Sequence, residues 1–475
     1  MRRPALPRTD GGRLLLLLAL ATAVTLFTAT VPLLRDWFDL RVYHGTVTTW
    51  VHDGGRVYDY RVPGTPYGFT YPPFAAVVML PMALVGTRTA IAVALLLNLA
   101  ALAVSLRVLT GPAWRRYGWY GVGLAACGLA LFEPLRDTVS FGQVNLVLLA
   151  LVLTDCALLS GGRAARWAGV GIGLAAAIKL TPALFIGLLL VAGRRRAAAL
   201  ATAVAVGATA CAALVAPDAS RFYWTTALWD TGRVGRLDYV SNQSLQGVLA
   251  RLGVEGRPVW ALLVVLVLGW WAWRVRRAAE AGNPTAAFAL TGLTACLVSP
   301  ITWVHHLVWL LPSFAVLVRA GHARVAAGLY AVLCTSVVWL WYDDASGVGG
   351  FLGANLYTWI TLGLLLGLPV GQTSARPPDR RRALRRSAQT TEPAPSRPAP
   401  ATQPARAQPP SAVAPSAEAT GDAGAAGAGA PAAAGADALG RGAGAGRTRS
   451  PSSDPTGSTF PAAANPQSSS ARASS

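Results

Sequence analysis

Apolar runs long enough to cross a bilayer recur along the first 370 positions of this 475-residue chain. A run of roughly 18 to 22 residues spans the hydrocarbon core as a helix, because each helical residue adds about 1.5 Å. Only 13% of the residues are charged, about half the share that a soluble domain carries. The sequence therefore predicts an all-α, polytopic membrane helical bundle with about 10 to 12 transmembrane segments. The runs lie near residues 14–34, 88–107, 118–132, 143–160, 197–215, 258–275, 285–302, 303–318, 324–342 and 351–370.

Two further apolar stretches contain helix breakers and are predicted to be broken or re-entrant. Prolines interrupt residues 72–86, and Lys179 with Pro182 interrupts residues 167–192. Interrupted helices at membrane depth are tolerated only where they line a protein or water-filled cavity. These stretches are therefore where the sequence predicts an internal cavity.

The formal net charge is +20, of which +6 lies beyond residue 375, and other arginines form short clusters between the apolar runs. Because such clusters face the cytoplasm, we expect a multi-pass protein of the cell membrane with both termini cytoplasmic. This distribution favours contact with membrane lipids over nucleic-acid binding. The loops that then lie outside are 35–74, 133–142, 216–257 and 342–352. The clusters are Arg115-Arg116, Arg163 with Arg166, Arg194-Arg195-Arg196, Arg274 with Arg276-Arg277, and Arg319 with Arg324.

Composition divides the chain into a transmembrane domain, residues 1–372, and a C-terminal region, residues 373–475. In the latter an arginine-rich patch at 376–386 gives way to Pro, Ala, Gly and Ser. That composition buries too little apolar surface to fold, so we predict a disordered cytoplasmic tail. The five cysteines all lie in apolar runs without CxxC spacing, and no HExxH or DxD-type cluster occurs. We expect no metal and no cofactor.

Two carboxylates, Asp36 and Asp39, follow the first apolar run and would lie at the outer membrane surface. A general base must be ionised and within reach of the hydroxyl that it deprotonates. For Asp36 we favour the simpler interpretation, an acid that solvates a loop. For Asp39, which is followed by Arg41 and Tyr43, both interpretations stay open.

Lys179 lies in an apolar context and is the only lysine in the chain. An intramembrane lysine is costly, usually faces an interior cavity and pairs with an anion, and a lipid phosphate would serve. The alternative is a side chain that reaches to the membrane interface. We favour the functional interpretation.

Amide and imidazole side chains supply further candidates. Gln143 and Asn145 begin an apolar run, and Asn242 lies in the 216–257 loop, where each would bind sugar hydroxyls or neighbouring helices. His305 and His306 are adjacent, so on a helix they point about 100° apart, and metal binding is disfavoured. A hydrogen bond from one of them to a phosphate or sugar is the better interpretation.

These signals occur in an order that resembles glycosyltransferase family 87, the actinobacterial polyprenol-phosphate-mannose-dependent α-1,2-mannosyltransferases, which include the phosphatidylinositol mannoside mannosyltransferases. The resemblance covers roughly residues 14–370 and leaves out the tail. The motifs that carry it are Asp39-x-x-x-Tyr43, Gly55-x-x-Tyr58, FTYPPF at 69–74, GQVN at 142–145, IKLTP at 178–182, NQSLQG at 242–247 and SPITWVHH at 299–306.

The resemblance implies a GT-C-like fold with an extracytoplasmic active site. It also implies a β-linked polyprenyl-phosphate-mannose donor, a hydroxyl of a lipid-linked or cell-envelope glycan as acceptor, and inversion to an α-1,2 linkage. Asp39 would then be the general base. The residues that would contact substrate are Arg41, Tyr43, Gln143, Asn145, Lys179, Asn242 and either His305 or His306.

Two alternatives stay open. The same machinery would also suit another polyprenyl-phosphate sugar, such as arabinofuranose or glucose, because nothing in the sequence itself selects mannose. A transporter of lipid-linked oligosaccharides is less favoured. Transporters place ionisable groups near the midplane and often contain internal repeats, whereas here the polar signals concentrate in outer loops and at the ends of the apolar runs.

Overall fold

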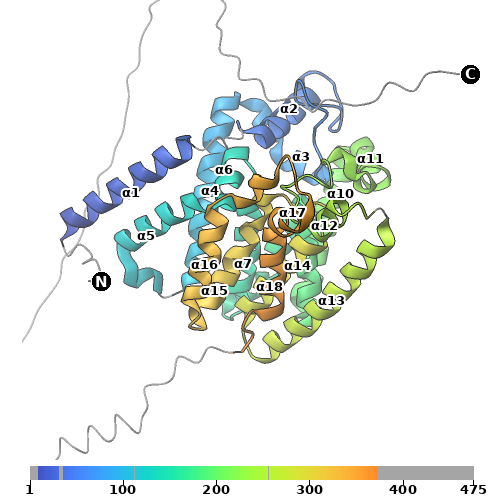
Figure 1. The fold of residues 1–475 in the computed structure, drawn as a ribbon. Helices are drawn as coiled ribbons and strands as arrows, with labels where there is room; N and C mark the ends of the chain where they lie inside the picture. Colours follow the sequence, from blue (N-terminus) through green and yellow to red (C-terminus); the bar gives the residue numbers. More distant parts are fainter. Residues whose placement is uncertain (1–8, 31–35, 112, 255, 372–475) are drawn as a thin grey trace, which may run out of the picture. The chain divides into compact units, whose positions relative to one another are not determined.

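The computed structural model describes residues 9–30, 36–111, 113–254 and 256–371 (Figure 1). The predicted tail and the end of the first apolar run lie outside the described residues. The described part is helical and contains no β-strand, which confirms the all-α class. The α-helices are α1 (Asp10–Thr30), α2 (Phe38–His52), α3 (Pro73–Met79), α4 (Thr87–Thr110), α5 (Ala113–Leu131), α6 (Glu133–Phe141), α7 (Asn145–Leu158), α8 (Val170–Ile178), α9 (Leu184–Val191), α10 (Arg195–Val215), α11 (Pro217–Thr225), α12 (Leu245–Arg251), α13 (Arg257–Glu280), α14 (Pro284–Val298), α15 (Leu311–Arg319), α16 (Ala323–Cys334), α17 (Gly347–Ala354) and α18 (Leu356–Gly367). The 3-10 helices are η1 (Leu80–Leu84), η2 (Arg163–Trp167), η3 (Thr181–Ala183), η4 (Ala227–Trp229), η5 (Thr231–Arg233), η6 (Val304–Leu310) and η7 (Val337–Trp341).

Among the described residues, α1, α4, α10 and α13 are each long and apolar enough to cross a membrane. Two bent helix pairs pass the same test, α6 with α7 at 117° and α17 with α18 at 60°, which raises the number to as many as six. The other apolar helices are 10–17 residues long. The protein is therefore embedded in a membrane, and the number of ten to twelve spans stays a prediction.

Helix α14 lies at the centre of the hydrophobic core, beside α7, α13 and α18 (Figure 1). Every residue from Ala286 to Leu297 is buried. Small residues make up much of this stretch and permit close helix contacts, and a helix that is apolar on all sides is expected to be buried. The Asn283 side chain accepts a hydrogen bond from the Ala286 amide at 3.1 Å and caps the helix start.

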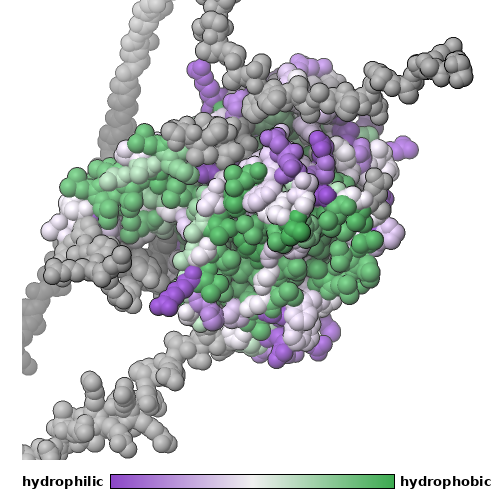
Figure 2. All heavy atoms as spheres, viewed as in Figure 1, coloured by the Kyte–Doolittle hydropathy of each residue, from purple (hydrophilic) through white to green (hydrophobic). Residues whose placement is uncertain are grey.

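Apolar side chains gather over the middle of the face drawn in Figure 2, and hydrophilic residues lie mainly towards its two ends. Exposed apolar residues such as Leu262, Val265 and Leu266 of α13 belong to this kind of surface. Contact between water and so large an apolar area is unfavourable, whereas contact between this area and lipid tails is favourable. The surface therefore agrees with a membrane-embedded bundle.

The stretch 35–74, predicted as a loop, contains helix α2. Its buried residues Leu40, Tyr43 and Val47 recur at helical spacing and pack towards the protein. The polar residues between them hide this period in the sequence. As a result the Asp39 side chain projects from the first turn of a helix.

Both predicted interruptions are breaks in the structure. Pro72 is extended and leads into the short helix α3. Helix α8 ends at Ile178, Lys179 is extended with φ −144° and ψ 130°, and a new helical turn starts at Thr181. The sequence did not predict the sharp bend between α6 and α7.

Candidate active site

Asp39 contacts Gln143 across two elements that are distant in the sequence. The Asp39 Oδ2 atom accepts a hydrogen bond from Gln143 Nε2 at 2.8 Å. Gln143 lies in the bend that follows α6, which Gly142 ends with a φ of 71°, a conformation that favours glycine. The bend therefore turns the amide towards the first turn of α2.

Tyr71 extends the contact. Its hydroxyl donates to Gln143 Oε1 at 2.7 Å and accepts from the Tyr43 hydroxyl at 2.9 Å. Tyr71 comes directly before the two prolines that start α3. Helices α2, α3 and α6 lie at the same end of the bundle (Figure 1), so three elements deliver polar groups to one point.

The ammonium group of Lys179 lies at the other side of Tyr71. Its Nζ atom is 3.3 Å from the Tyr71 hydroxyl, 3.0 Å from Asn145 Oδ1 and 2.9 Å from His306 Nε2. It also lies over the Tyr71 ring, 4.9 Å from its centroid. Tyr71 and Asn145 accept these hydrogen bonds through neutral oxygen atoms, so the ammonium group is held without an acidic residue among its acceptors.

His306, and not His305, faces this cluster. The main-chain N–H of Trp303 donates to His306 Nδ1 at 3.1 Å, so in the neutral ring the proton is on Nε2, next to Lys179. The His305 ring instead packs edge-on against Phe141, with centroids 5.1 Å apart. Two potential donors, Lys179 Nζ and His306 Nε2, therefore point at the same place, as an anionic oxygen would require.

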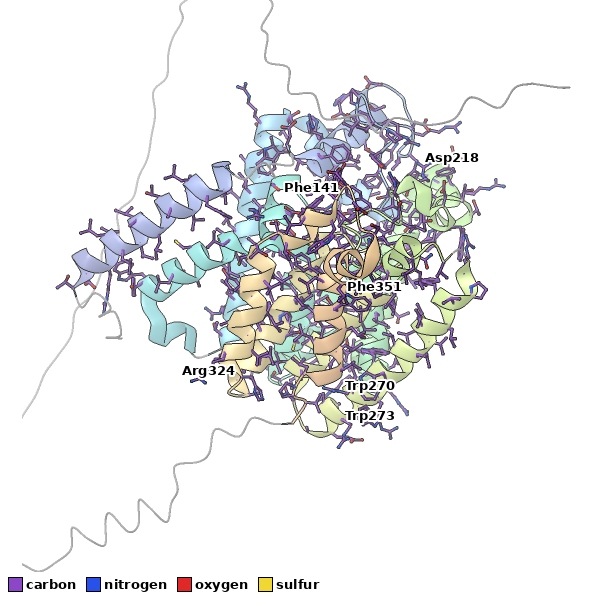
Figure 3. The ribbon with its side chains drawn as sticks, viewed as in Figure 1. Phe141, Asp218, Trp270, Trp273, Arg324 and Phe351 are labelled. Carbon is purple, nitrogen blue, oxygen red and sulfur yellow. The ribbon has the colours of Figure 1, made fainter. Side chains whose placement is uncertain are left out.

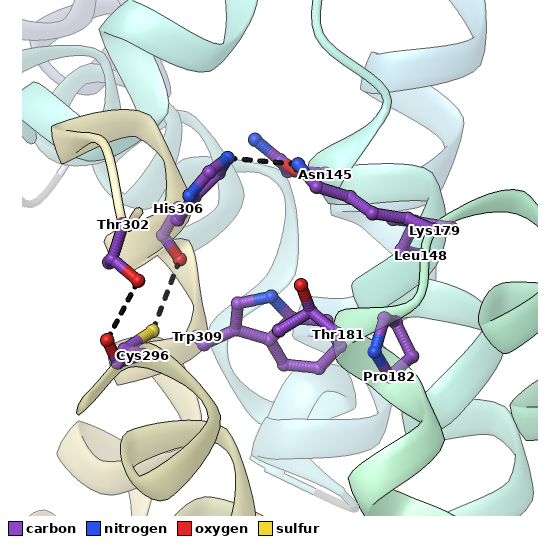
Figure 4. Close-up of a pocket in the computed structure, with 9 residues that line it drawn as sticks. All are labelled: Asn145, Leu148, Lys179, Thr181, Pro182, Cys296, Thr302, His306 and Trp309. Carbon is purple, nitrogen blue, oxygen red and sulfur yellow. Dashed lines mark hydrogen bonds between the residues drawn. The ribbon is translucent and has the colours of Figure 1, made fainter. Parts of the chain in front are cut away.

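A small pocket opens beside this pair and has room for about one water molecule. Figure 4 shows that Lys179 and His306 approach each other over it. The pocket as it stands is too small to hold a sugar phosphate. The residues that line the pocket are Asn145, Leu148, Lys179, Thr181, Pro182, Cys296, Thr302, His306 and Trp309.

The protonation of Asp39 is set by its surroundings. Burial raises the pKa of the Asp39 carboxyl from 3.8 to about 6, although the Gln143 N–H and the positive charge of Lys179 oppose the rise. The carboxylate is then ionised at neutral pH and has a far higher proton affinity than an ordinary aspartate. Both properties suit a general base.

The other predicted residues lie outside this cluster. Arg41 pairs with Asp36 at 2.9 Å, and the two side chains are 42% and 64% exposed. Asn242 is fully buried, and its amide oxygen and nitrogen bind main-chain groups, among them the N–H of Thr302 at 2.9 Å and the carbonyl of Pro300 at 3.2 Å. Asn242 therefore braces the segment before His306.

The sequence alone does not single out Tyr71 as a site residue, because the prolines that follow it indicate only a break in an apolar stretch, and FTYPPF enters only as a motif of the family resemblance. The one available indication was the position of the Tyr71 hydroxyl, directly before the prolines that start α3. In the described part of the chain, no group of three or more His, Cys, Asp or Glu side chains could hold a metal ion.

Comparison with known proteins gives a family and several relatives. The model of glycosyltransferase family 87 matches residues 69–300. A polyprenol-phosphate-mannose-dependent alpha-(1-2)-phosphatidylinositol mannoside mannosyltransferase of Mycobacterium tuberculosis (strain ATCC 25618 / H37Rv) is 34% identical over 321 residues, which are 63% of this chain and 74% of that protein. The protein of the same description from Mycolicibacterium smegmatis is 32% identical over 339 residues, 64% and 76% of the two chains. A phosphatidylinositol pentamannoside mannosyltransferase of Mycobacterium tuberculosis (strain CDC 1551 / Oshkosh) is 32% identical over 357 residues, 71% and 80%. No solved structure matches significantly.

Proposed function

Because this chain belongs to glycosyltransferase family 87, and is thus a membrane-embedded hexosyltransferase, we propose that it transfers mannose from polyprenyl-phosphate-mannose to a hydroxyl of a phosphatidylinositol mannoside or related lipid-linked glycan. The new bond would be an α-1,2 linkage formed with inversion. Mannose and the acceptor class follow the names of the relatives.

One observation carries the proposal: a continuous set of hydrogen bonds joins Asp39, through Gln143 and Tyr71, to Lys179, whose Nζ atom lies 2.9 Å from His306 Nε2. A carboxylate with a raised pKa lies at one end, and two cationic or N–H donors lie at the other. Inverting transfer from a lipid phosphate needs these two functions within the length of one sugar.

The chemistry assigns each end a role. The acceptor oxygen attacks the anomeric carbon while Asp39 takes the hydroxyl proton. The bond from that carbon to the phosphate oxygen breaks, and its electron pair stays on the departing polyprenyl phosphate. Lys179 and His306 stabilise the additional negative charge. Phosphate is a good leaving group, so no second carboxylate is needed as an acid.

The site would face the extracytoplasmic side. Phe141, next to the site, lies near one end of the bundle, and Arg324 and Trp273 lie near the opposite end (Figure 3). Arg324 belongs to one of the short arginine clusters, which are retained in the cytoplasm. The polyprenyl donor would then be bound from the outer leaflet, with the N-terminus and the C-terminus inside.

Transfer by purified protein tests the proposal. The full chain in lipid nanodiscs is given polyprenyl-phosphate-mannose and phosphatidylinositol mannosides, and labelled product is measured for wild type, Asp39→Asn and the matched Asp36→Asn. We expect Asp39→Asn to lower kcat/KM by at least about 100-fold and Asp36→Asn to change it by less than about threefold. Wild-type transfer by Asp39→Asn would refute the site. A wild-type protein that moves lipid across vesicles but transfers no sugar from any polyprenyl donor would refute the function.

A further inference from the structure

The Tyr71 hydroxyl is the centre of the hydrogen-bond network. It lies 2.7 Å from Gln143 Oε1, 2.9 Å from the Tyr43 hydroxyl and 3.3 Å from Lys179 Nζ. The residue is buried, with 8% of its surface exposed. Its hydroxyl therefore bonds both Gln143, the partner of Asp39, and Lys179.

The chemistry of these groups fixes the direction of every bond. An ionised carboxylate only accepts, so Gln143 must present its Nε2 to Asp39 and its Oε1 to Tyr71. Tyr71 has a single hydroxyl proton and must donate it to that oxygen. Its lone pairs then accept from the Tyr43 hydroxyl and from Lys179 Nζ. The hydrogen bonds therefore run in one direction and end on Asp39.

Tyr71 is itself held rigidly. Its main-chain carbonyl accepts from the Tyr58 hydroxyl at 2.8 Å. Its ring packs against Tyr43 and Phe69, with centroids 5.5 Å and 5.9 Å away, and Pro72 restricts its backbone. A hydroxyl on such a fixed ring can set the orientation of a neighbour that would otherwise rotate.

We propose that Tyr71 is a positioning residue, whose hydroxyl locks the Gln143 amide with its N–H₂ group towards Asp39 and ties this pair to Lys179. The proposal rests on the proposed function only in taking Asp39 as the base. It adds a residue that acts on Asp39 through Gln143 and need not touch either sugar.

Removing the hydroxyl leaves Gln143 Oε1 without its donor. The amide then gains freedom to turn over and bring its oxygen, in place of its N–H₂, next to Asp39. Repulsion between the two oxygens disfavours the ionised carboxylate, so the pKa of Asp39 rises further. A role in packing alone would lower stability and would leave the ionisation of Asp39 unchanged.

The test compares Tyr71→Phe with the control variant Tyr223→Phe, which removes a hydroxyl from the same buried aromatic cluster at a ring that stacks on Tyr58, with centroids 6.1 Å apart. Asp39 ionisation is titrated by infrared spectroscopy, with its carboxylic acid band assigned by its loss in Asp39→Asn. We expect Tyr71→Phe to raise the midpoint by about one pH unit and Tyr223→Phe to leave it in place. An unchanged midpoint in folded Tyr71→Phe overturns the proposal.

Gln143→Met alone, which leaves Tyr71 intact, keeps the test decisive if Tyr71→Phe folds poorly. It removes the N–H₂ group from Asp39 and should raise the midpoint at least as far as expected for Tyr71→Phe, and an unchanged midpoint would overturn the proposal. In a Gln143→Met background the amide is gone, so adding Tyr71→Phe should not move the midpoint further. An additional shift of the same size would show that Tyr71 does not act through Gln143. Because the infrared titration needs no substrate, it is independent of sugar transfer, and an inactive wild type would refute the proposed function alone.

Discussion

The pH dependence of transfer follows directly from the surroundings of Asp39. With the pKa of this carboxyl raised by burial to about 6, about nine-tenths of the enzyme holds an ionised base at pH 7 and about one-tenth at pH 5. Only the ionised form accepts the acceptor proton, so kcat/KM should fall about tenfold between these pH values. With an ordinary aspartate pKa near 4, more than nine-tenths of the carboxylates would stay ionised at pH 5, and the rate would barely change.

The assay should measure kcat/KM at low donor concentration, from pH 5 to pH 8 at constant ionic strength. The donor is a phosphodiester, which has no ionisation in this range. The released polyprenyl phosphate is a monoester with a second pKa near 6, so kcat can include a pH-dependent product release and is less informative. Enzyme held at pH 5 and returned to pH 7 should recover full activity, which excludes acid denaturation as the cause of the fall.

Two results would refute the reasoning. A profile that stays flat from pH 7 to pH 5 would mean that Asp39 is not the base or is not desolvated in the active enzyme. Asp36 pairs with Arg41 at the exposed surface, so Asp36→Asn should not shift the pH at which kcat/KM falls. A shift in that variant would indicate that Asp36, and not Asp39, is the base.

Two further predictions concern the phosphate side and the bend. Lys179→Met keeps most of the side-chain volume but removes the cation, so kcat/KM in the same assay should fall about 100-fold or more. Near-normal transfer by this variant would argue against a role of Lys179 in holding the donor phosphate. Gly142→Ala should lower both activity and thermal stability, because Gly142 has a φ of +71° and a new Cβ would lie 2.6 Å from the Cβ of Leu40, next to Asp39. Gly207→Ala in α10, where a Cβ meets nothing within 4 Å, is its control and should retain wild-type activity and a melting temperature no lower than that of wild type.

Much of the fold was predictable, because the thickness of a bilayer sets the length of an apolar helix that crosses it, and runs of that length are visible in the sequence. Helices α4, α10 and α13 start and end within a few residues of the predicted apolar runs. The break at Lys179 was also predictable, since a charged residue and a nearby proline cannot continue an apolar helix cheaply. Helix α2 was not predicted, because its buried face is interrupted by histidine, threonine and glycine.

The site was predictable as a set of residue types but not as an arrangement. Gln143 and Asn145 are two positions apart, and the sequence offers them the same role. In the structure Gln143 lies in the bend and meets Asp39, whereas Asn145 begins α7 and meets Lys179. The choice between His305 and His306 depends on a main-chain N–H, that of Trp303. No residue pattern reveals such a contact.

The site is built from interruptions of helices, and this explains why its polar groups can meet at all. Gln143 lies between α6 and α7, Lys179 between α8 and η3, and His306 in a 3-10 turn that follows a non-helical segment. A regular helix inside a membrane satisfies its own main-chain hydrogen bonds and leaves no main-chain donor for a ligand. A break frees main-chain groups, which need polar partners, and these polar groups are then also available to a ligand. The same breaks would lower stability if they faced lipid and did not line a cavity inside the protein. Their convergence on one network, through the Tyr71 hydroxyl, is thus a physical reason to treat these polar residues as one site, in which changing one residue alters the surroundings of the others.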